Sequence, residues 1–399
     1  MSAIPQLRVL DFTRVLAGPV CTMLLGDYGA DVIKVERPGR GDDTRHWGPP
    51  WAGGGAARLS AYFFCVNRNK RSLTLNLRMT EGRELARRLA RQSDVLIENF
   101  RVGQMAAWGL DYETLAGDNP GLVYCSISGY GQAGPRAREP GYDSVIQAQS
   151  GLMAITGEAD GVPVKIGVAL SDVITGLYAT TAIQAALLQR ERGGRGQYVD
   201  VALFDSQLAA MVNIASNALI DGAEPGRYGN AHPSIVPYQT FQAADRSFSL
   251  AVGNDRQFAR LCAIVGREEL AADPRFADNP SRVKHREALI PPLAAAFRAA
   301  PAQRWIDAAL AAGIPAGPIN SVGEALADPQ VGARGLVQDV TLGDGSVAPM
   351  VGPVAQLSAA PATIRLAPPT LGRHTEEVLR ERLGLNDDEV ADLRRRGAL

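Results

Sequence analysis

One carboxylate stands out near the middle of the chain. Asp172 is the only acidic residue in the largely apolar, glycine-containing stretch 163–176. It could cap a helix that starts at this point, because Ser and Asp side chains accept hydrogen bonds from the free N–H groups of a first turn. It could instead be a nucleophile toward an activated acyl group, a role open to a partly desolvated carboxylate. The local pattern alone favours the cap and leaves the nucleophile open.

The composition predicts a folded protein of enzyme size. The chain has 399 residues, of which 46% are hydrophobic, and a formal net charge of -1. Such a chain can bury one large core or two unequal ones. Its charge gives no overall field that would favour nucleic acid or an anionic membrane. An anionic ligand would therefore be held by local groups.

Neither cysteine spacing nor the N-terminal residues indicate a metal site or an export signal. The four cysteines, at 21, 65, 125 and 262, have no metal-binding or redox spacing and are interpreted as buried thiols. Residues 1–8 lead directly into a strand pattern, and no apolar run is long enough to span a bilayer. We expect no metal, no membrane association and a reducing, cytoplasmic location.

Strand and helix signals alternate through the first two hundred residues, which predicts an α/β fold with a Rossmann-like large domain. The predicted strands are 8–12, 31–36, 72–77, 95–98, 122–127 and 197–202, and the predicted helices are 18–28, 80–91, a long one after Asp172 and one reaching Leu219. Thr80 and Asn386 are predicted helix caps. We expect a large domain over 1–220, a smaller α+β domain over 221–327 and a C-terminal segment over 328–399 that returns to the large domain.

Several familiar sites are absent from the sequence. There is no G-x-x-x-x-G-K-[ST] loop, no H-E-x-x-H, no G-x-S-x-G, and no G-x-G-x-x-G after the first strand. The four histidines are scattered and are interpreted as structural, with His232 the exception to watch. This argues against nucleotide hydrolysis, zinc hydrolysis and dinucleotide-dependent dehydrogenation.

Six segments form a recognisable pattern in their order and spacing. They are VLDFTRVLAGP at 9–19, GADVIKVER at 29–37, NKRS at 69–72, ENF at 98–100, GYG at 129–131 and the Asp172 stretch. Together they resemble the class III CoA-transferases, the CaiB/BaiF family, over residues 6–385. The resemblance implies an interlocked homodimer and makes Asp172 the nucleophile that carries acyl and CoA groups in turn. It also implies that Gly253, Asn254 and Gln257 belong to a glycine-rich lid near the substrate.

The resemblance further implies a set of CoA contacts. Leu16 and Ala17 would line the nucleotide, Arg37 would face its phosphates, Leu75 and Arg78 would flank it, and Asn99 and Phe100 would hold the adenine and pantetheine region. Tyr142 and Asp143 complete the predicted CoA-binding set. Leu16, Leu75 and Phe100 could equally be plain core residues. A basic contact of some relatives falls near Ala107, so one phosphate contact is missing here or comes from another residue.

Two other functions remain as alternatives. The same fold carries α-methylacyl-CoA racemases, which use a His–Asp pair, but the histidine position here is Tyr142. A phenol, with an unperturbed pKa of about 10, is poorly matched to that proton transfer. A non-catalytic acyl-CoA-binding protein is the second alternative.

The substrate prediction rests on residues 227–241 and on Gly253 with Asn254. These segments are most similar to the succinyl-CoA:glutarate (hydroxymethylglutarate) type of transferase. The predicted donor is therefore succinyl-CoA and the predicted acceptor is a dicarboxylate. Arg227, His232 and Tyr238 are candidates for the second anionic subsite that a dicarboxylate needs, or they could brace the linker between the domains.

Overall fold

The computed structural model describes residues 3–55 and 58–399. The chain divides into two compact units, of which unit 1 contains the residues up to Leu152, Lys165–Gly222 and Pro329–Leu399. Unit 2 contains Met153–Val164 and Ala223–Asp328. The sequence placed the domain boundaries at residues 220 and 327. It also assigned 153–164 to the large domain, whereas this segment packs within unit 2.

Unit 1 is built on a six-stranded sheet in which all neighbouring strands are parallel. The strands are β1 (Arg8–Asp11), β2 (Asp31–Glu36), β5 (Lys70–Thr74), β6 (Val95–Glu98), β7 (Val123–Ser128) and β8 (Tyr198–Ala202). Their order, β5-β2-β1-β6-β7-β8, reverses direction between β1 and β6. This is the doubly wound Rossmann order, and ligands of such sheets bind at the carboxyl ends of the strands where the order reverses.

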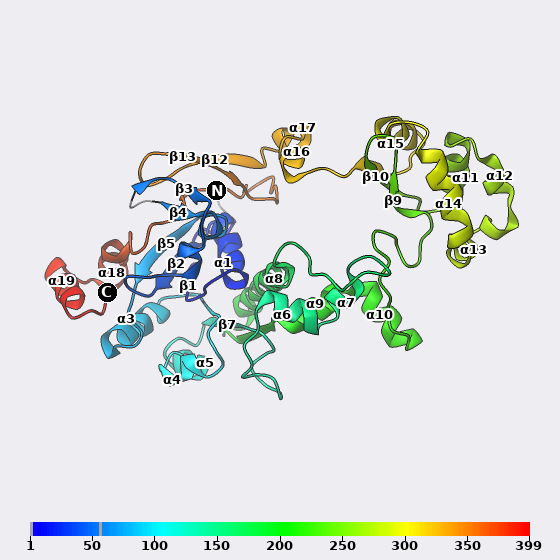
Figure 1. Cartoon of the computed structure of the whole chain (residues 1–399). Helices are drawn as coiled ribbons and strands as arrows, with labels where there is room; N and C mark the ends of the chain where they lie inside the picture. Colours follow the sequence, from blue (N-terminus) through cyan, green and yellow to red (C-terminus); the bar gives the residue numbers. More distant parts are fainter. Residues whose placement is uncertain (1–2, 56–57) are drawn as a thin grey trace. The chain divides into compact units, whose positions relative to one another are not determined.

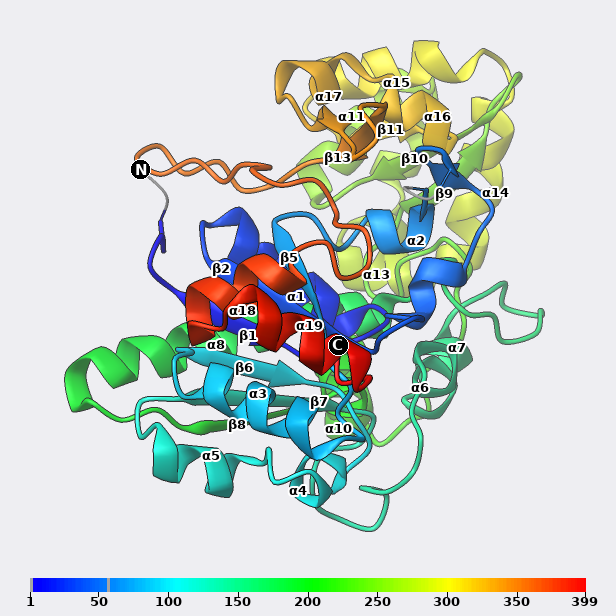
Figure 2. The same cartoon turned by 90° about the vertical axis from the view of Figure 1, so that its left-hand side faces the viewer.

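Helices cover both faces of this sheet (Figure 1). The helices of unit 1 are α1 (Ala17–Asp27), α2 (Ala61–Phe64), α3 (Thr80–Ala90), α4 (Gln104–Ala107), α5 (Tyr112–Asp118), α6 (Asp143–Gln149), α8 (Leu170–Gly193), α9 (Leu203–Ala210), α10 (Val212–Asp221), α17 (Pro329–Ala333), α18 (Thr375–Leu383) and α19 (Asp387–Arg395). The short α7 (Leu152–Ile155) begins at the boundary and belongs mostly to unit 2. One buried cluster joins the sheet to α1, α8 and α9, and another joins it to α3, α5, α18 and α19. Figure 2 shows α18 and α19 beside α3, so the C-terminal segment completes the second layer.

Two small antiparallel pairs complete unit 1. They are β3 (Trp51–Ala52) with β4 (Leu59–Ser60), and β12 (Val337–Thr341) with β13 (Val347–Val351). The sequence from residue 335 onward indicates two short antiparallel strands, over 335–337 and 340–345, with a turn. An antiparallel pair does form here, but its strands lie at 337–341 and 347–351, and residues 343–345 belong to the connection between them.

Unit 2 has its own core around a three-stranded antiparallel sheet of order β11-β10-β9. Its elements are β9 (Tyr238–Gln242), β10 (Ser247–Ala251), β11 (Ala316–Pro318), α11 (Asp255–Ile264), α12 (Glu268–Ala272), α13 (Asn279–Lys284), α14 (Arg286–Phe297), α15 (Ala302–Ala311) and α16 (Val322–Leu326). Phe241, Phe248 and Phe297 pack against one another in tilted and edge-to-face arrangements, with ring centroids 4.8–6.4 Å apart.

A close contact between α1 and α8 fixes the position of Asp172. A Cβ atom placed on Gly176 would lie 2.6 Å from the carbonyl oxygen of Ala17 and 2.9 Å from Cβ of Val20. Only glycine fits between the two helices at this point. The first turn of α8, which carries Asp172, is therefore held against the first turn of α1.

Most predicted elements match the observed ones, and the differences have local causes. The strands 31–36 and 95–98 are confirmed, and Asn386 does cap α19 in a capping box. Thr80 is the first helical residue of α3 rather than its cap, so its side chain cannot serve the turn in the predicted way. The helix after β8 is split into α9 and α10 at Met211.

The cysteines are all free, and three of them are buried. Cys65 is exposed, which corrects the interpretation of four buried thiols. Within the described residues, no helix combines the length and the apolar composition that a membrane crossing requires.

The contact at Gly176 gives a first prediction. Gly176→Ala should destabilise the protein by about 1–3 kcal/mol, because the new methyl group forces α8 away from α1. Chemical unfolding measures this change. The matched control is Gly117→Ala in α5, where a Cβ atom meets nothing within 4 Å and helix propensity should make the change neutral or slightly stabilising. Equal stability of the two variants would contradict the tight packing.

Candidate active site

Two cavities lie where the sheet order reverses, at the loops that follow β1 and β6. The first has a volume of about 490 Å³ and contains four arginines, so we call it the arginine cavity. The second has a volume of about 350 Å³ and contains Asp172, so we call it the Asp172 cavity. Arg14, Phe100 and Arg101 line both, so the two cavities are adjacent. Together they have the size of a site for an extended small molecule.

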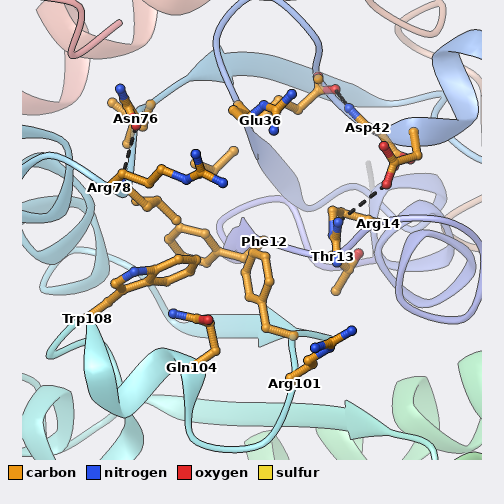
Figure 3. A pocket seen from close by; sticks show the side chains of 17 residues that line it. Phe12, Thr13, Arg14, Glu36, Asp42, Asn76, Arg78, Arg101, Gln104 and Trp108 are labelled. Carbon is orange, nitrogen blue, oxygen red and sulfur yellow. Dashed lines mark hydrogen bonds and ion pairs between the residues drawn. The ribbon is translucent and has the colours of Figure 1, made fainter. Parts of the chain in front are cut away.

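The arginine cavity combines cationic and aromatic groups. Its lining includes Phe12, Thr13, Arg14, Arg37, Leu75, Leu77, Arg78, Phe100, Arg101, Gln104 and Trp108. Three carboxylates also line it, Glu36, Asp42 and Asp43, and they pair with Arg45, Lys34 and Arg14 respectively. Figure 3 shows Arg78, Gln104 and Trp108 along one side of the cavity and Thr13 with Arg14 on the other. In the part of the chain that the structure describes, no carboxylate forms an ion pair with Arg37, Arg78 or Arg101. Unpaired guanidinium groups next to aromatic rings suit a nucleotide with several phosphates.

The Asp172 cavity is smaller, and its walls come from several loops. It is lined by Val15, Ala17, Asn99, Phe100, Ile127, Ser128, Gly129, Ala137, Arg138, Glu139, Pro140, Gly141, Tyr142, Asp172 and Leu203, together with Arg14, Arg101 and Val102. Ile127 and Leu203 add apolar side chains to the wall of this cavity.

Asp172 lies at the N-termini of two helices. It occupies the third position of α8, whose N-cap is Ala169, so the prediction that Asp172 or Ser171 is the cap was wrong. The backbone N–H of Ala17, the first residue of α1, donates to its carboxylate. Free N–H groups at helix starts attract negative charge. The α8 start is capped instead by Asp143, whose carboxylate accepts from the Ser171 N–H at 2.8 Å.

The environment makes Asp172 easier to protonate than an ordinary aspartate. Burial and the like charge of Asp143 raise the pKa of Asp172 to about 7, although the hydrogen bond from Ala17 opposes this shift. Carboxylates with such values cluster at functional sites. A poorly hydrated carboxylate is also a better nucleophile than one in water, because it has less solvation to lose.

The loop after β1 is held in a strained conformation. Val15 has a φ of 69°, in the left-handed region that a β-branched residue rarely adopts. The side chain of Asn99 holds the neighbouring Arg14 from both sides, accepting from its N–H at 2.9 Å and donating to its carbonyl at 2.7 Å. Asn99 therefore ties the loop after β1 to the loop after β6, across the point where the sheet order reverses.

Two buried lysines hold the backbone of this loop through hydrogen bonds to its carbonyl groups. Lys34 Nζ donates to the Thr13 carbonyl at 2.8 Å and to Asp42 at 2.9 Å. Burial opposes its charge, but Asp42 and neighbouring carboxylates outweigh that effect and raise the pKa of Lys34. Lys70 Nζ donates to the Pro19 carbonyl at 3.0 Å and lies 3.4 Å from Asp11, while burial lowers its pKa to about 8. Both ends of the turn 13–19 thus rest on fully buried ammonium groups.

The structure brings many of the predicted site residues together. Arg37, Leu75 and Arg78 line the arginine cavity, Ala17, Asn99, Tyr142 and Asp172 line the other, and Phe100 lines both. Leu16 lines neither cavity and packs with Val20, Met23 and Val66, which corresponds to its core alternative. Asp143 contacts the α8 start rather than lining a cavity.

The sequence interpretation missed Arg14, Arg101, Gln104 and Trp108. Arg14 and Arg101 lie in the loops after β1 and β6, so the strand order alone would have pointed to them. Trp108 packs edge-on against Phe100, with centroids 5.1 Å apart. It follows Ala107, where some relatives have a basic residue, and the sequence carries no signal that it turns toward the cavity.

The predicted substrate residues lie in unit 2. Arg227 donates to the backbone carbonyls of Glu158, Ala154 and Gly161. His232 and Tyr238 stack on each other, with ring centroids 5.3 Å apart.

The predicted lid segment is tied to its surroundings. Asn254 caps α11 by accepting from the Gln257 N–H at 2.9 Å. Gln257 accepts from the Gly253 N–H at 2.8 Å and donates to the Gly313 carbonyl at 2.7 Å. Among the described residues, no group of three or more His, Cys, Asp or Glu side chains is arranged to hold a metal ion.

Comparison with known proteins identifies the family. The family described as CoA-transferase family III matches residues 4–375. The chain belongs to this family. It is an enzyme, a class III CoA-transferase, and its substrates include a CoA thioester and a carboxylate.

Curated relatives and a solved structure resemble this CoA-transferase over most of its length. A succinate–glutarate CoA-transferase of Agrobacterium fabrum is 48% identical over 377 residues, which is 94% of each chain. A succinyl-CoA:glutarate CoA-transferase of Homo sapiens is 44% identical over 389 residues, covering 97% of this chain and 87% of the human one. The crystal structure of a CaiB/BaiF family protein from Brucella suis, 45% identical, superimposes with a TM-score of 0.84 and covers 96% of this chain and 99% of that one.

The electrostatics of Asp172 give a pH prediction for the CoA-transferase. If the ionised carboxylate is the reactive form, kcat/KM should fall as the pH drops below about 7, the pKa of Asp172. Asp143→Asn should move this acid limb to lower pH, because it removes a like charge while an oxygen acceptor for the Ser171 N–H remains.

Rates of CoA exchange between about pH 5 and pH 9 would measure the acid limb of the wild type and that of Asp143→Asn. Asp118→Asn, at an exposed ion pair in α5, is the control and should leave the profile unchanged. A limb that stays in place or moves to higher pH in Asp143→Asn would contradict the coupling between the two carboxylates.

Proposed function

We propose that this CoA-transferase moves CoA from succinyl-CoA to glutarate or a similar dicarboxylate, with Asp172 as the covalent nucleophile. One observation carries the proposal. A partly buried carboxylate, accepting from a helix N-terminus, lines a cavity that adjoins an arginine-rich cavity of nucleotide character. The named activities of the relatives supply the substrate class.

The two cavities divide a CoA thioester between them. The nucleotide end occupies the arginine cavity, where Arg37, Arg78 and Arg101 meet the phosphates and Trp108 with Phe100 offers apolar surface to the base. The pantetheine arm passes Phe100, which lines both cavities, and brings the thioester to Asp172. The proposed contacts of Ala17, Leu75 and Asn99 fit this path.

The exchange conserves the energy of the thioester through covalent steps. An Asp172 oxygen attacks the thioester carbonyl, the C–S bond breaks, and a mixed anhydride and a CoA thiolate remain. The thiolate attacks the Asp172 carbonyl carbon and releases succinate, which leaves an aspartyl-CoA thioester. The acceptor carboxylate then attacks this thioester to form a second anhydride and to release the thiolate. Attack of the thiolate on the acceptor carbonyl forms the new acyl-CoA and restores Asp172.

Unit 2 supplies the proposed lid and acceptor subsite. In an interlocked homodimer, we propose that Gly253, Asn254 and Gln257 of one protomer cover the Asp172 site of the other. The Gly253 N–H now donates to Gln257 Oε1, so an oxyanion would replace that acceptor. Of the three candidate substrate residues, Arg227 already donates to three backbone carbonyls through its guanidinium group. This favours the alternative in which Arg227 braces the linker between the domains. His232 and Tyr238 remain as partners for the second carboxylate of the acceptor.

We further propose that the enzyme works as a homodimer in the cytoplasm. In α10, Leu219 and Ile220 are 86% and 87% exposed, and α8 exposes Leu177, Tyr178 and Leu188. Apolar faces of this kind mark interfaces. Because α8 also carries Asp172, a second copy that covers these helices would adjoin the active site. Four free cysteines fit a reducing compartment.

The covalent role of Asp172 is tested by substitution and trapping. Asp172→Asn and Asp172→Ala should lower CoA exchange between succinyl-CoA and glutarate by about a thousandfold or more, because the bond-forming group is lost. Free CoA should still bind both variants.

Incubation of the wild type with succinyl-CoA and then hydroxylamine should modify Asp172, as peptide mapping by mass spectrometry would detect. Glutarate and hydroxymethylglutarate should be better acceptors than acetate. Full turnover in either variant, or an unmodified Asp172, would remove the covalent mechanism. Epimerisation of a 2-methylacyl-CoA without exchange would instead indicate the racemase alternative.

The homodimer is tested by light scattering after size-exclusion chromatography. The wild type should have twice the mass of the chain. Leu219→Asp combined with Ile220→Asp should shift the enzyme toward monomer, because charges would be buried in the interface. Lys284→Glu, at an exposed position of unit 2, is the control. A wild type that elutes as a monomer contradicts the dimer.

A further inference from the structure

A buried carboxyl group that has no part in the proposed chemistry lies behind the two cavities. Glu98 is the last residue of β6 and is 5% exposed. It lines a third, smaller cavity of about 250 Å³, which also contains Arg101, Tyr112, Tyr124, Ser126, Gln132 and Tyr198. We call this the Glu98 cavity. It does not contain Asp172.

The carboxyl group of Glu98 holds the backbone of the next loop. Its Oε2 atom accepts from the N–H of Phe100 at 2.8 Å, and the hydroxyl of Ser126 bonds to the same carboxyl group. In the described part of the chain, no cation forms an ion pair with it. Within the structure, the role of this side chain is therefore to fix a backbone corner rather than to balance a charge.

That corner is the wall between the arginine cavity and the Asp172 cavity. Asn99 holds the Arg14 backbone through two hydrogen bonds, and the Phe100 ring lines both cavities. The ring packs edge-on to Trp108, and the Arg14 guanidinium lies 5.2 Å from its centroid. Arg101, the next residue, lines all three cavities. A shift of the Phe100 backbone would move all of these groups together.

We propose that Glu98 is a positioning residue for the CoA thioester, which it serves by holding the Asn99–Phe100 corner through the hydrogen bond to the Phe100 N–H. The proposal rests on the proposed function, in which CoA runs from one cavity to the other past Phe100. Substitution of Glu98 should therefore change the affinity for CoA, whereas substitution of a residue that only stabilises the same strand should not.

The charges around Glu98 also give the corner a pH dependence. Burial, opposed by the hydrogen bonds from Ser126 and Phe100, raises the pKa of Glu98 to about 7, and Asp200 on β8 adds to the rise. The Glu98 cavity contains six other ionisable groups. Four lie between β6 and α5 or in α5, and two lie on strands β7 and β8: Arg101, Asp111, Tyr112, Glu113, Tyr124 and Tyr198. Carboxylates outnumber the single cation. As the pH rises through 7, an ionised Glu98 adds a negative charge beside a polyanionic ligand, so CoA binding should weaken.

Calorimetric titration with free CoA tests the proposal in the Asp172→Asn background, where the nucleophile no longer titrates. Glu98→Ala should raise the Kd for CoA about tenfold, because the corner loses its acceptor. Glu98→Gln keeps an oxygen acceptor and should bind within about twofold of its parent at pH 6. At pH 8, Glu98→Gln should bind about threefold more tightly than the parent, because it cannot ionise.

With Asp172 restored, Glu98→Ala should raise KM for succinyl-CoA and leave kcat within about twofold.

Asp94→Asn is the matched control. Asp94 directly precedes β6 at the other end of the strand, where it accepts from the Arg8 N–H and pairs with Arg190. This control should cost stability without changing CoA affinity.

Different failures have different meanings. Unchanged CoA affinity in Glu98→Ala, or an equal loss in Asp94→Asn, would overturn the role of Glu98 while the proposed function stands. A wild type that binds no CoA would overturn both. If Glu98→Ala does not fold, Glu98→Gln at pH 6 decides: a Kd for CoA about tenfold or more above that of its parent would overturn the proposal, because this variant keeps the oxygen acceptor for the Phe100 N–H.

Discussion

The contact between α1 and α8 near their N-termini is the constraint on which the active site depends. Gly176 lets α8 approach the Ala17 carbonyl, and the same approach directs the Ala17 N–H at the Asp172 carboxylate. One contact thus sets both the place of the nucleophile and one of its hydrogen bonds. Burial is the larger effect on its pKa, which is why Asp172 remains poised near neutrality although a helix start favours its charge.

The loop that meets Asp172 is stabilised at a considerable electrostatic cost. Lys34, Lys70 and Asp11 are all fully buried, a rare condition for charged groups unless each has partners. Removing Asp42 would leave Lys34 charged and unpaired, a change that typically costs about 3–5 kcal/mol. Such a network fixes the geometry of the turn 13–19, including the left-handed Val15, more firmly than apolar packing alone could.

Sequence patterns anticipated the elements better than the site. Strand β6 begins with the apolar run Val95–Ile97, and β2 carries its β-branched residues Val32, Ile33 and Val35 between charged ones, so β-branched content made the bounds of both predictable. The Asn386 cap was also predictable, because its partner Glu389 lies only three residues away. The cap of α8 was not, because it comes from Asp143, 28 positions away in the sequence. Trp108 and Arg101 became visible only when the strand order placed the loops after β1 and β6 side by side.

The discontinuity of unit 1 bears on how the chain is made. Strand β5 is an edge of the large sheet, and its flanking backbone is covered by the distant C-terminal segment. Asn69 N–H donates to Leu366, His374 N–H donates to the Ser72 carbonyl, and Asn76 N–H donates to Ala398. During synthesis this edge stays open until nearly three hundred further residues have left the ribosome, a span in which unit 2 can already assemble its own core. A nascent chain of this enzyme therefore passes through a long interval in which the edge of β5 is exposed and open to pairing with other chains.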